Sequence, residues 1–114
     1  MNHEEWIEQV KVIEWLKQCT DLSYIAISNE RKCTPQQARR LEQAGRISGV
    51  VDLLLPRSSA HGCCLWIEMK SKLGRLSAAQ IKFMKDRRLE GACAEVAYSA
   101  DEAILYIKHF YDIT

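Results

Sequence analysis

The stretch ISGVVDLLLP (residues 47–56) places Asp52 inside an apolar run, and LWIEMK (residues 65–70) ends a second run with Glu68 and Lys70. Both runs are short and bounded by turn-forming residues, which predicts buried β-strands at residues 50–55 and 63–69. A charge in a buried strand is costly unless another group pairs with it. The question is therefore what pairs with these side chains.

The turn-rich sequence PRSSAHG (residues 56–62) predicts that the two runs form an antiparallel hairpin. A symmetric hairpin sets Asp52 across from residues 66–68. Strand side chains alternate, so Glu68 and Lys70 share one face while Met69 points to the other. Two carboxylates this close repel, and burial raises the pKa of each. A salt bridge with Lys70 or a divalent cation such as Mg²⁺ would relieve the repulsion, and the residues alone leave both open.

Helical and strand patterns alternate along the rest of the chain. The periodicity predicts helices at residues 4–18, 34–45 and 77–90 and a final helix opened by Ser99, with strands at 24–27 and 93–98. Two capping boxes are expected, Ser77 with Gln80 and Ser99 with Glu102. The side chains expected to be buried are Trp6, Val10, Ile13 and Leu16 on the first helix, and Ile104, Ile107, Phe110 and Tyr111 on the last.

This order, αβαββαβα, predicts an α/β fold with a mixed central sheet flanked by helices. The 114 residues, 47% hydrophobic and with a net charge of +1, suit a single globular domain spanning 1–114. No apolar run is long enough to cross a bilayer, and the N-terminus MNHEEWIEQ lacks the cationic start of a signal peptide. Five cysteines without CxxC spacing favour free thiols in a reducing cytoplasm over disulfides or structural zinc.

Positive charge gathers between residues 70 and 88, which hold seven Lys or Arg and one acid, Asp86. A carboxylate edge beside such a run is typical of a phosphodiester site, although a solvated helix face is the alternative interpretation. The residues expected to contact nucleic acid are Lys72, Arg75, Lys82, Arg87 and Arg88.

Asp52, then Glu68-Met69-Lys70, then Gln80 after SKLGRLSAA resemble the PD-(D/E)xK nuclease superfamily, and in particular its VRR-Nuc type. The similarity runs almost the full chain. Its segments are Glu5 with Gln9, ISNERK (27–32), LEQAGRISGVVDLLLP (41–56), IEMKSKLGRLSAAQ (67–80) and AEVAYSADEAI (94–104). One departure is Val51, which stands where the family usually has a proline.

The resemblance implies a restriction-endonuclease-like core and a metal-dependent nuclease. Asp52 and Glu68, with the backbone carbonyl of Met69, would be ligands of Mg²⁺ or Mn²⁺. Lys70 would position the attacking water or stabilise the transition state. Gln80 would face the site, although its capping position alone also explains it.

Glu5 would contribute to the same site from the first helix, and a plain acid at a helix start is the other interpretation. Glu4 and Glu8 compete with it for this role. We prefer Glu5 because Glu5 and Gln9 lie one turn apart on the same helix face.

The resemblance also implies a homodimer that cuts branched DNA, namely four-way junctions. The alternatives are a nuclease for flaps, nicks or linear ends, and a non-catalytic DNA-binding scaffold in which Asp52, Glu68 and Lys70 form only an ion-paired network. His3, His61 and His109 are expected at the surface. Trp6, Trp15 and Trp66 are expected in the core or at an interface, with Trp6, Trp15 and Tyr111 as candidates for a dimer surface.

Overall fold

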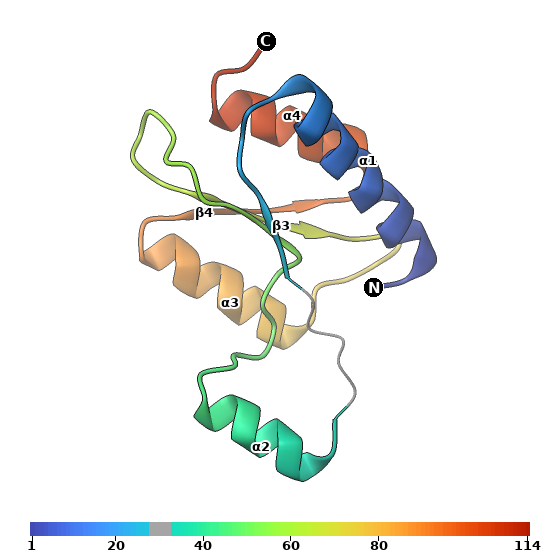
Figure 1. Ribbon diagram of the computed structural model, residues 1–114, viewed down its shortest axis with the longest axis vertical. Coiled ribbons are helices and arrows are strands. Elements are labelled where there is room, and N and C mark those ends of the chain that lie inside the picture. The colour runs from blue at the N-terminus through green and yellow to red at the C-terminus, as the bar shows by residue number, and fades with distance from the viewer. Residues whose placement is uncertain (28–32) are drawn as a thin grey trace.

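Four strands form one mixed sheet in the computed structural model, which describes residues 1–27 and 33–114 (Figure 1). The spatial order follows the chain: β1 (Ile25–Ala26), β2 (Leu53–Leu55), β3 (Leu65–Met69) and β4 (Cys93–Ala97). β1 with β2 and β2 with β3 pair antiparallel, whereas β3 and β4 pair parallel. The parallel step requires a crossover, which α3 provides.

Helices cover both faces of this sheet. α1 (His3–Cys19) and α4 (Ala100–Phe110) lie side by side on one face, and α3 (Ala78–Leu89) lies on the other (Figure 1). α2 (Pro35–Gln43) stands apart from these layers and has no buried residue. The order αβαββαβα and the mixed sheet confirm the predicted fold class.

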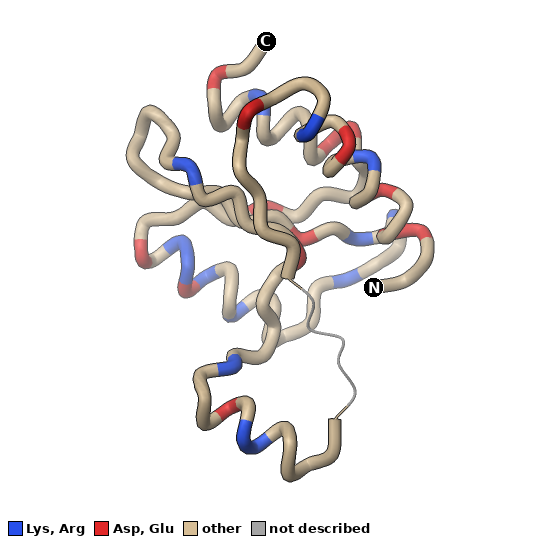
Figure 2. The backbone as a smooth tube through the Cα atoms, in the orientation of Figure 1, with Lys and Arg blue, Asp and Glu red and all other residues tan. Residues whose placement is uncertain are grey.

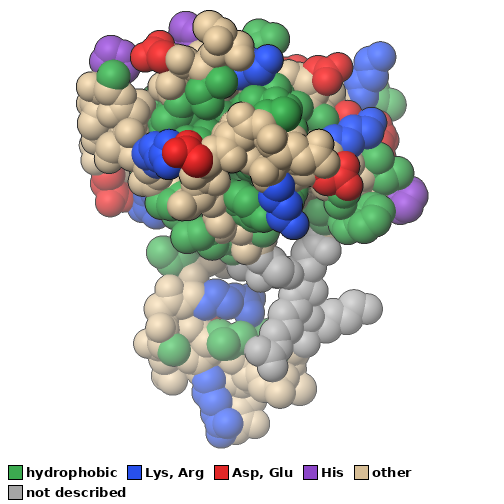
Figure 3. Space-filling model, turned by 45° about the horizontal axis from the view of Figure 1, so that its top comes forward, with side chains coloured by type: hydrophobic (Ala, Val, Ile, Leu, Met, Phe, Trp, Pro, Cys, Tyr) green, Lys and Arg blue, Asp and Glu red, His purple; other side chains and the backbone are tan. Residues whose placement is uncertain are grey.

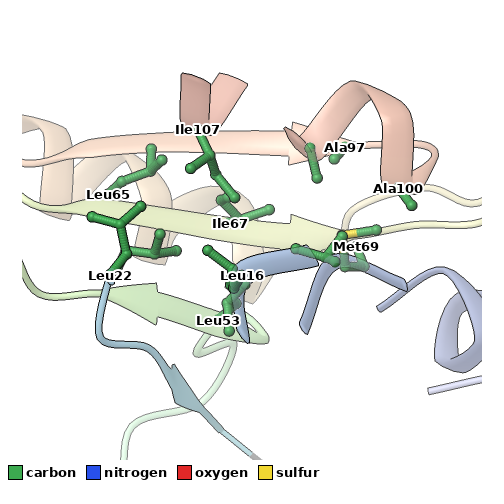
Figure 4. Close-up of a cluster of buried hydrophobic side chains, with 12 residues drawn as sticks. Leu16, Leu22, Leu53, Leu65, Ile67, Met69, Ala97, Ala100 and Ile107 are labelled. Atoms are coloured by element: carbon green, nitrogen blue, oxygen red, sulfur yellow. The ribbon is translucent and has the colours of Figure 1, made fainter. Parts of the chain in front are cut away.

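The main core lies between the sheet and the α1/α4 layer. Leu53, Leu65 and Ile67 from the strands meet Leu16 of α1 and Ile107 of α4, and all five are at most 1% exposed (Figure 4). A smaller cluster on the α3 face holds Val51, Phe83, Met84 and Ala94. Because side chains alternate between the two faces along each strand, the strands contribute to two separate apolar layers, one on each face of the sheet.

Helix starts follow the expected capping chemistry with one exception. The Ser77 hydroxyl accepts from the Gln80 N–H at 3.1 Å, and the Gln80 side chain accepts from the Ser77 N–H at 3.0 Å. Ser99 likewise accepts from the Glu102 N–H, but the Glu102 carboxylate accepts from the Tyr106 hydroxyl at 2.8 Å. The second predicted capping box is therefore half formed.

The predicted burial of α1 is partly wrong. Trp6 is 55% exposed, whereas Glu5 and Val12 join Leu16 on the buried side. The apolar spacing predicted that Trp6 faces the core. In the first turn, however, α1 lies over a polar hollow instead of the core.

Other boundaries differ by a few residues. The strands are shorter than predicted, and on α4 the buried residues are Ala100, Ala103 and Ile107, with Ile104 half-buried. No helix in the described part of the chain is long and apolar enough to cross a membrane.

Candidate active site

A hollow of about 690 Å³ opens at the sheet edge where β2 begins and β3 ends. Polar side chains from both helical layers and both strands line it: Glu5 and Gln9 of α1, Asp52 before β2, Glu68 and Lys70 at the end of β3, and Gln80 of α3. We call this hollow the site cavity. It contains every catalytic residue that the sequence predicted.

Asp52 and Glu68 lie side by side at the open end of the β2–β3 hairpin. Leu53 pairs with Ile67, so the next position sets Asp52 opposite Glu68, at one end of the predicted range. The Asp52 N–H donates to Glu68 Oε1 at 3.1 Å, and the Met69 N–H donates to Asp52 Oδ2 at 3.0 Å. Each carboxylate thus holds a backbone group of the other strand, and we call Asp52 and Glu68 the carboxylate pair.

Burial makes this carboxylate pair electrostatically costly. The pKa of Glu68 is raised to about 7, chiefly by burial and then by the charge of Asp52. Burial also raises the pKa of Asp52, and the nearby Glu5 carboxylate adds to the rise, while the Met69 N–H opposes it. One positive charge, from Lys70, does not fully offset two buried negative charges.

Lys70 and Gln80 both contact one oxygen of Glu68. Lys70 Nζ lies 3.3 Å from Glu68 Oε2, and Gln80 Nε2 donates to the same oxygen at 2.8 Å. Because the capping box fixes the other end of the Gln80 amide, this side chain links the start of α3 to the carboxylate pair. The capping and site-facing interpretations of Gln80 are therefore compatible.

The first helix directs Glu5, and not the competing acids Glu4 and Glu8, toward the site cavity. Glu5 is 9% exposed and caps its own helix by accepting from the Asn2 N–H at 3.2 Å. Glu4 is exposed. Glu8 pairs with Lys11 of its own helix at 2.8 Å and accepts from the Ala100 N–H at the start of α4 at 3.1 Å.

The donors of the site cavity fit a hard divalent cation. Carboxylate, carbonyl and amide oxygens are the ligands that Mg²⁺ prefers, and two protein carboxylates with waters suffice for it. Gln9 Oε1, which is buried at this cavity, has no hydrogen-bond partner among the described residues. No group of three or more His, Cys, Asp or Glu side chains in the described part of the chain is arranged as a metal cage. The residues suit an ion held mostly by water and substrate.

Comparison with known proteins places this chain in a family. The family model of the VRR-NUC domain matches residues 2–101. The chain belongs to the VRR-NUC domain family. A solved structure described as a VRR_NUC domain protein superposes with a TM-score of 0.74 over 99% of this chain and 92% of that one, at 23% identity. No curated protein sequence matches significantly.

Membership in the VRR-NUC family gives the coarse function. VRR-NUC is a nuclease family, so this domain has a nuclease-type DNA-processing function with DNA as its substrate. Such nucleases generally use divalent metal ions. The recognition of the family from Asp52, Glu68-Met69-Lys70 and Gln80 is confirmed.

The basic residues predicted to bind DNA divide into two groups. Lys72 and Arg75 are exposed in the loop between β3 and α3, directly after Lys70. Figure 2 shows how Lys and Arg are distributed along the backbone, with several on α3. Of the other predicted residues, Lys82 pairs with Asp86 at 2.8 Å, Arg87 with Glu90 while lying over the Phe83 ring, and Arg88 with the Ala94 carbonyl. These three side chains already have protein partners, so Lys72 and Arg75 are the stronger candidates.

Sequence reasoning missed Gly49 of the VRR-NUC domain. Its φ of +79° is in the left-handed region, and an added Cβ would lie 2.3 Å from the Ala79 backbone carbon and 2.7 Å from the Gln80 nitrogen. The chain before Asp52 is thus pressed against the first turn of α3. The glycine three residues before the aspartate was the available signal.

The tryptophans and Tyr111, which the sequence placed in the core or at an interface, occupy different surroundings. Trp6 lines the site cavity, while Trp15 packs on the main core and Trp66 contacts Phe83 edge to face at 5.1 Å. The Tyr111 hydroxyl donates to the Leu55 and Arg57 carbonyls. Residues 28–32 of the segment ISNERK lie outside the described residues.

Proposed function

We propose that this VRR-NUC domain is a Mg²⁺- or Mn²⁺-dependent, structure-selective DNA endonuclease that cuts four-way junctions as a homodimer. The observation that carries the proposal is the carboxylate pair: a buried Glu68 and a half-buried Asp52, held side by side by the 3.1 and 3.0 Å backbone hydrogen bonds, with Lys70 beside them. Burial of two like charges has little structural benefit, so a bound cation is the simplest explanation.

Asp52, Glu68 and the Met69 carbonyl would hold the ion, and Glu5 would face it from α1. When bound, such an ion polarises the phosphoryl group and lowers the pKa of a water molecule. Asp52 and Glu68 keep their orientation through the hydrogen bonds across the hairpin. Gln80 further fixes Glu68, since its amide is anchored at both ends.

Lys70 supplies a fixed positive charge beside the reacting phosphate. Its side chain is 15% exposed, so the charge acts in a partly desolvated setting where electrostatic stabilisation is strong. The ammonium would orient the attacking water and stabilise the charge that develops on the phosphate oxygens. Lys72 and Arg75, which follow on the exposed loop, would bind neighbouring phosphates.

A homodimer would compensate for the small footprint of one domain. A two-fold dimer doubles the phosphate contacts and presents two sites, as cutting a four-way junction requires. Exposed apolar side chains, among them Ile7 at 37% and Leu105 at 66%, lie on α1 and α4, and hydrophobic side chains are visible between charged ones on this side of the molecule (Figure 3). These helices are the candidate dimer surface.

Two alternatives remain distinct from junction cutting. The first is a nuclease that uses the same chemistry to cut flaps, nicks or linear ends. We expect each of these nuclease activities to be located in the cytoplasm. A non-catalytic DNA-binding scaffold is favoured by one observation, namely that Glu68 already has partners in Lys70 and Gln80. In a scaffold, the same contacts would be purely structural.

A cleavage assay separates these functions. Junction, flap and linear duplex DNA are incubated with Mg²⁺, Mn²⁺ or EDTA, using the wild type, Lys70→Ala and the matched control Lys17→Ala on the exposed end of α1. We expect metal-dependent cutting of junctions, lost in Lys70→Ala while DNA binding persists, and a solution mass of twice 13.1 kDa. Equal cutting of linear duplex refutes junction selectivity, and binding without cutting under any metal supports the scaffold.

A further inference from the structure

Trp6 lies at the site cavity and is 55% exposed, although an indole is usually buried. It directly follows Glu5, so the same turn of α1 that brings the acid to the cavity also presents the indole there. Val12 and Leu16 cover the core from this helix instead. The fold gains little from this side chain, which points to a role at the cavity.

The Trp6 ring is part of an aromatic pair. The His3 and Trp6 ring centroids are 5.9 Å apart and their planes differ by 17°, a stacked arrangement of residues three apart on one helix. His3 also lines the site cavity. Aromatic side chains presented in this way are the usual platforms for nucleic-acid bases, and every base offers a suitable face.

We propose that Trp6, supported by His3, stacks on an unstacked base, one with an uncovered face, next to the phosphate that is cut. In an intact duplex both faces of each internal base are covered by its neighbours, so the indole can reach a base only at a branch, flap or frayed end. Trp6 would therefore select DNA in which stacking is interrupted and a base face is exposed, which refines the substrate class of the proposed nuclease function on which this inference rests. The cavity of about 690 Å³ is in the size range of sites that hold small organic groups.

An exposed tryptophan can also contact a second copy of the chain, since tryptophan is enriched at protein–protein interfaces. The position of Trp6 disfavours it, because a protein seated on this ring would cover the opening that leads to Asp52 and Glu68. DNA, in contrast, must enter that opening for any cleavage. The location of the indole therefore favours a nucleobase.

Binding without metal tests the stacking directly. In EDTA, the affinities of the wild type, Trp6→Ala and Trp6→Phe are compared for a flap and for an intact duplex of equal length. Loss of one stacked base corresponds to about 5- to 150-fold weaker binding, so we expect this loss for the flap with Trp6→Ala and a change of less than about twofold for the duplex. Trp6→Phe should retain most of the affinity. Leu89→Ala, which removes an apolar side chain 76% exposed at the far end of α3, is the matched control.

Fluorescence gives an independent readout of the same contact. The chain has three tryptophans, so a Trp15→Phe/Trp66→Phe variant keeps Trp6 as its single indole. We expect single-stranded oligothymidine to quench its emission and an intact duplex to leave it unchanged.

Three results would overturn the proposal: equal loss of flap and duplex binding in Trp6→Ala, no loss of either, or a change of solution mass, which would assign Trp6 to a contact between copies. Failure of the nuclease function is a separate result. It would appear as wild-type protein that cuts no DNA with Mg²⁺, while the flap preference of the metal-free protein could still be measured.

Discussion

The two ends of the β2–β3 hairpin differ in chemistry: the closed end is apolar and fully buried, whereas the open end sets a half-buried Asp52 beside a buried Glu68. At the closed end, Leu55 pairs with Leu65 and Leu53 with Ile67, all at most 1% exposed. One position further, Asp52 stands opposite Glu68, which is 2% exposed. Burial of the apolar side chains at the closed end stabilises the folded state, whereas burial of the carboxylates at the open end destabilises it. Stability and chemistry are thus separated along a single pair of strands.

The largest expected effect comes from changing the open end. Glu68→Gln should lower Mg²⁺-dependent cleavage by roughly 10³-fold or more, since it removes one of the two carboxylates that would hold the ion. The free energy of unfolding in EDTA should stay equal or rise, because the substitution removes a repulsive buried charge. Cleavage rates and urea denaturation of the same protein check both parts. A marked loss of stability in EDTA would favour the purely structural ion-pair network.

The opposite outcome is expected at the closed end. Ile67→Ala truncates a side chain that is 0% exposed and should lower the free energy of unfolding by roughly 2–5 kcal/mol, through lost burial and a residual cavity. The folded fraction should still bind metal. Urea denaturation with a parallel Mn²⁺ titration checks this, and loss of metal binding by fully folded protein would show that the two ends are not separable.

The pH dependence of stability sharpens the comparison. The pKa of Glu68 is about 7 when folded and near its ordinary value of 4.5 when unfolded, so the folded state binds more protons between these pH values. In EDTA, the free energy of unfolding should therefore fall as pH rises from 4.5 to 7, by up to roughly 3 kcal/mol. Denaturation at several pH values measures this slope. Glu68→Gln should flatten it, and an identical slope in that variant would assign the effect to other groups.

The smallest effect concerns how the open end is supported. Gly49→Ala forces a left-handed residue against the backbone of Ala79 and should destabilise the protein by between about 1 and 3 kcal/mol. It should also lower kcat, since the first turn of α3 carries Gln80. Gly45→Ala is the control, because its φ is +106° but nothing lies within 4 Å of the added Cβ. Equal effects of the two changes would mean that backbone strain alone matters.

Local patterns were enough to predict much of this molecule. The turn-forming residues 56–62 predicted the hairpin and set Asp52 opposite residues 66–68, and the observed pairing with Glu68 lies at the end of that range because the connection runs on to residue 64. Strand alternation set Met69 on the other face. Capping chemistry predicted the starts of α2 and α3. The cysteines, as predicted, are free thiols. These features depend on residues close in sequence, where simple geometry decides.

Features that depend on tertiary contacts were not predictable. The exposure of Trp6 follows from the polar hollow beneath α1, which helical spacing does not reveal. The partner of Arg88, the Ala94 carbonyl, depends on where β4 passes the end of α3. Competition between two local partners was also not predictable: Glu102 turns to Tyr106, one helical turn further on, although its spacing from Ser99 fits a capping box.

Diffraction from crystals soaked in Mn²⁺ tests the central claim most directly, because the anomalous signal locates the ion. The account predicts one Mn²⁺ per chain between the Asp52 and Glu68 carboxylates, within about 2.3 Å of an oxygen of each, and its disappearance in Glu68→Gln crystals. A wild-type crystal with Lys70 still paired to Glu68 and no anomalous peak at the carboxylate pair would contradict it.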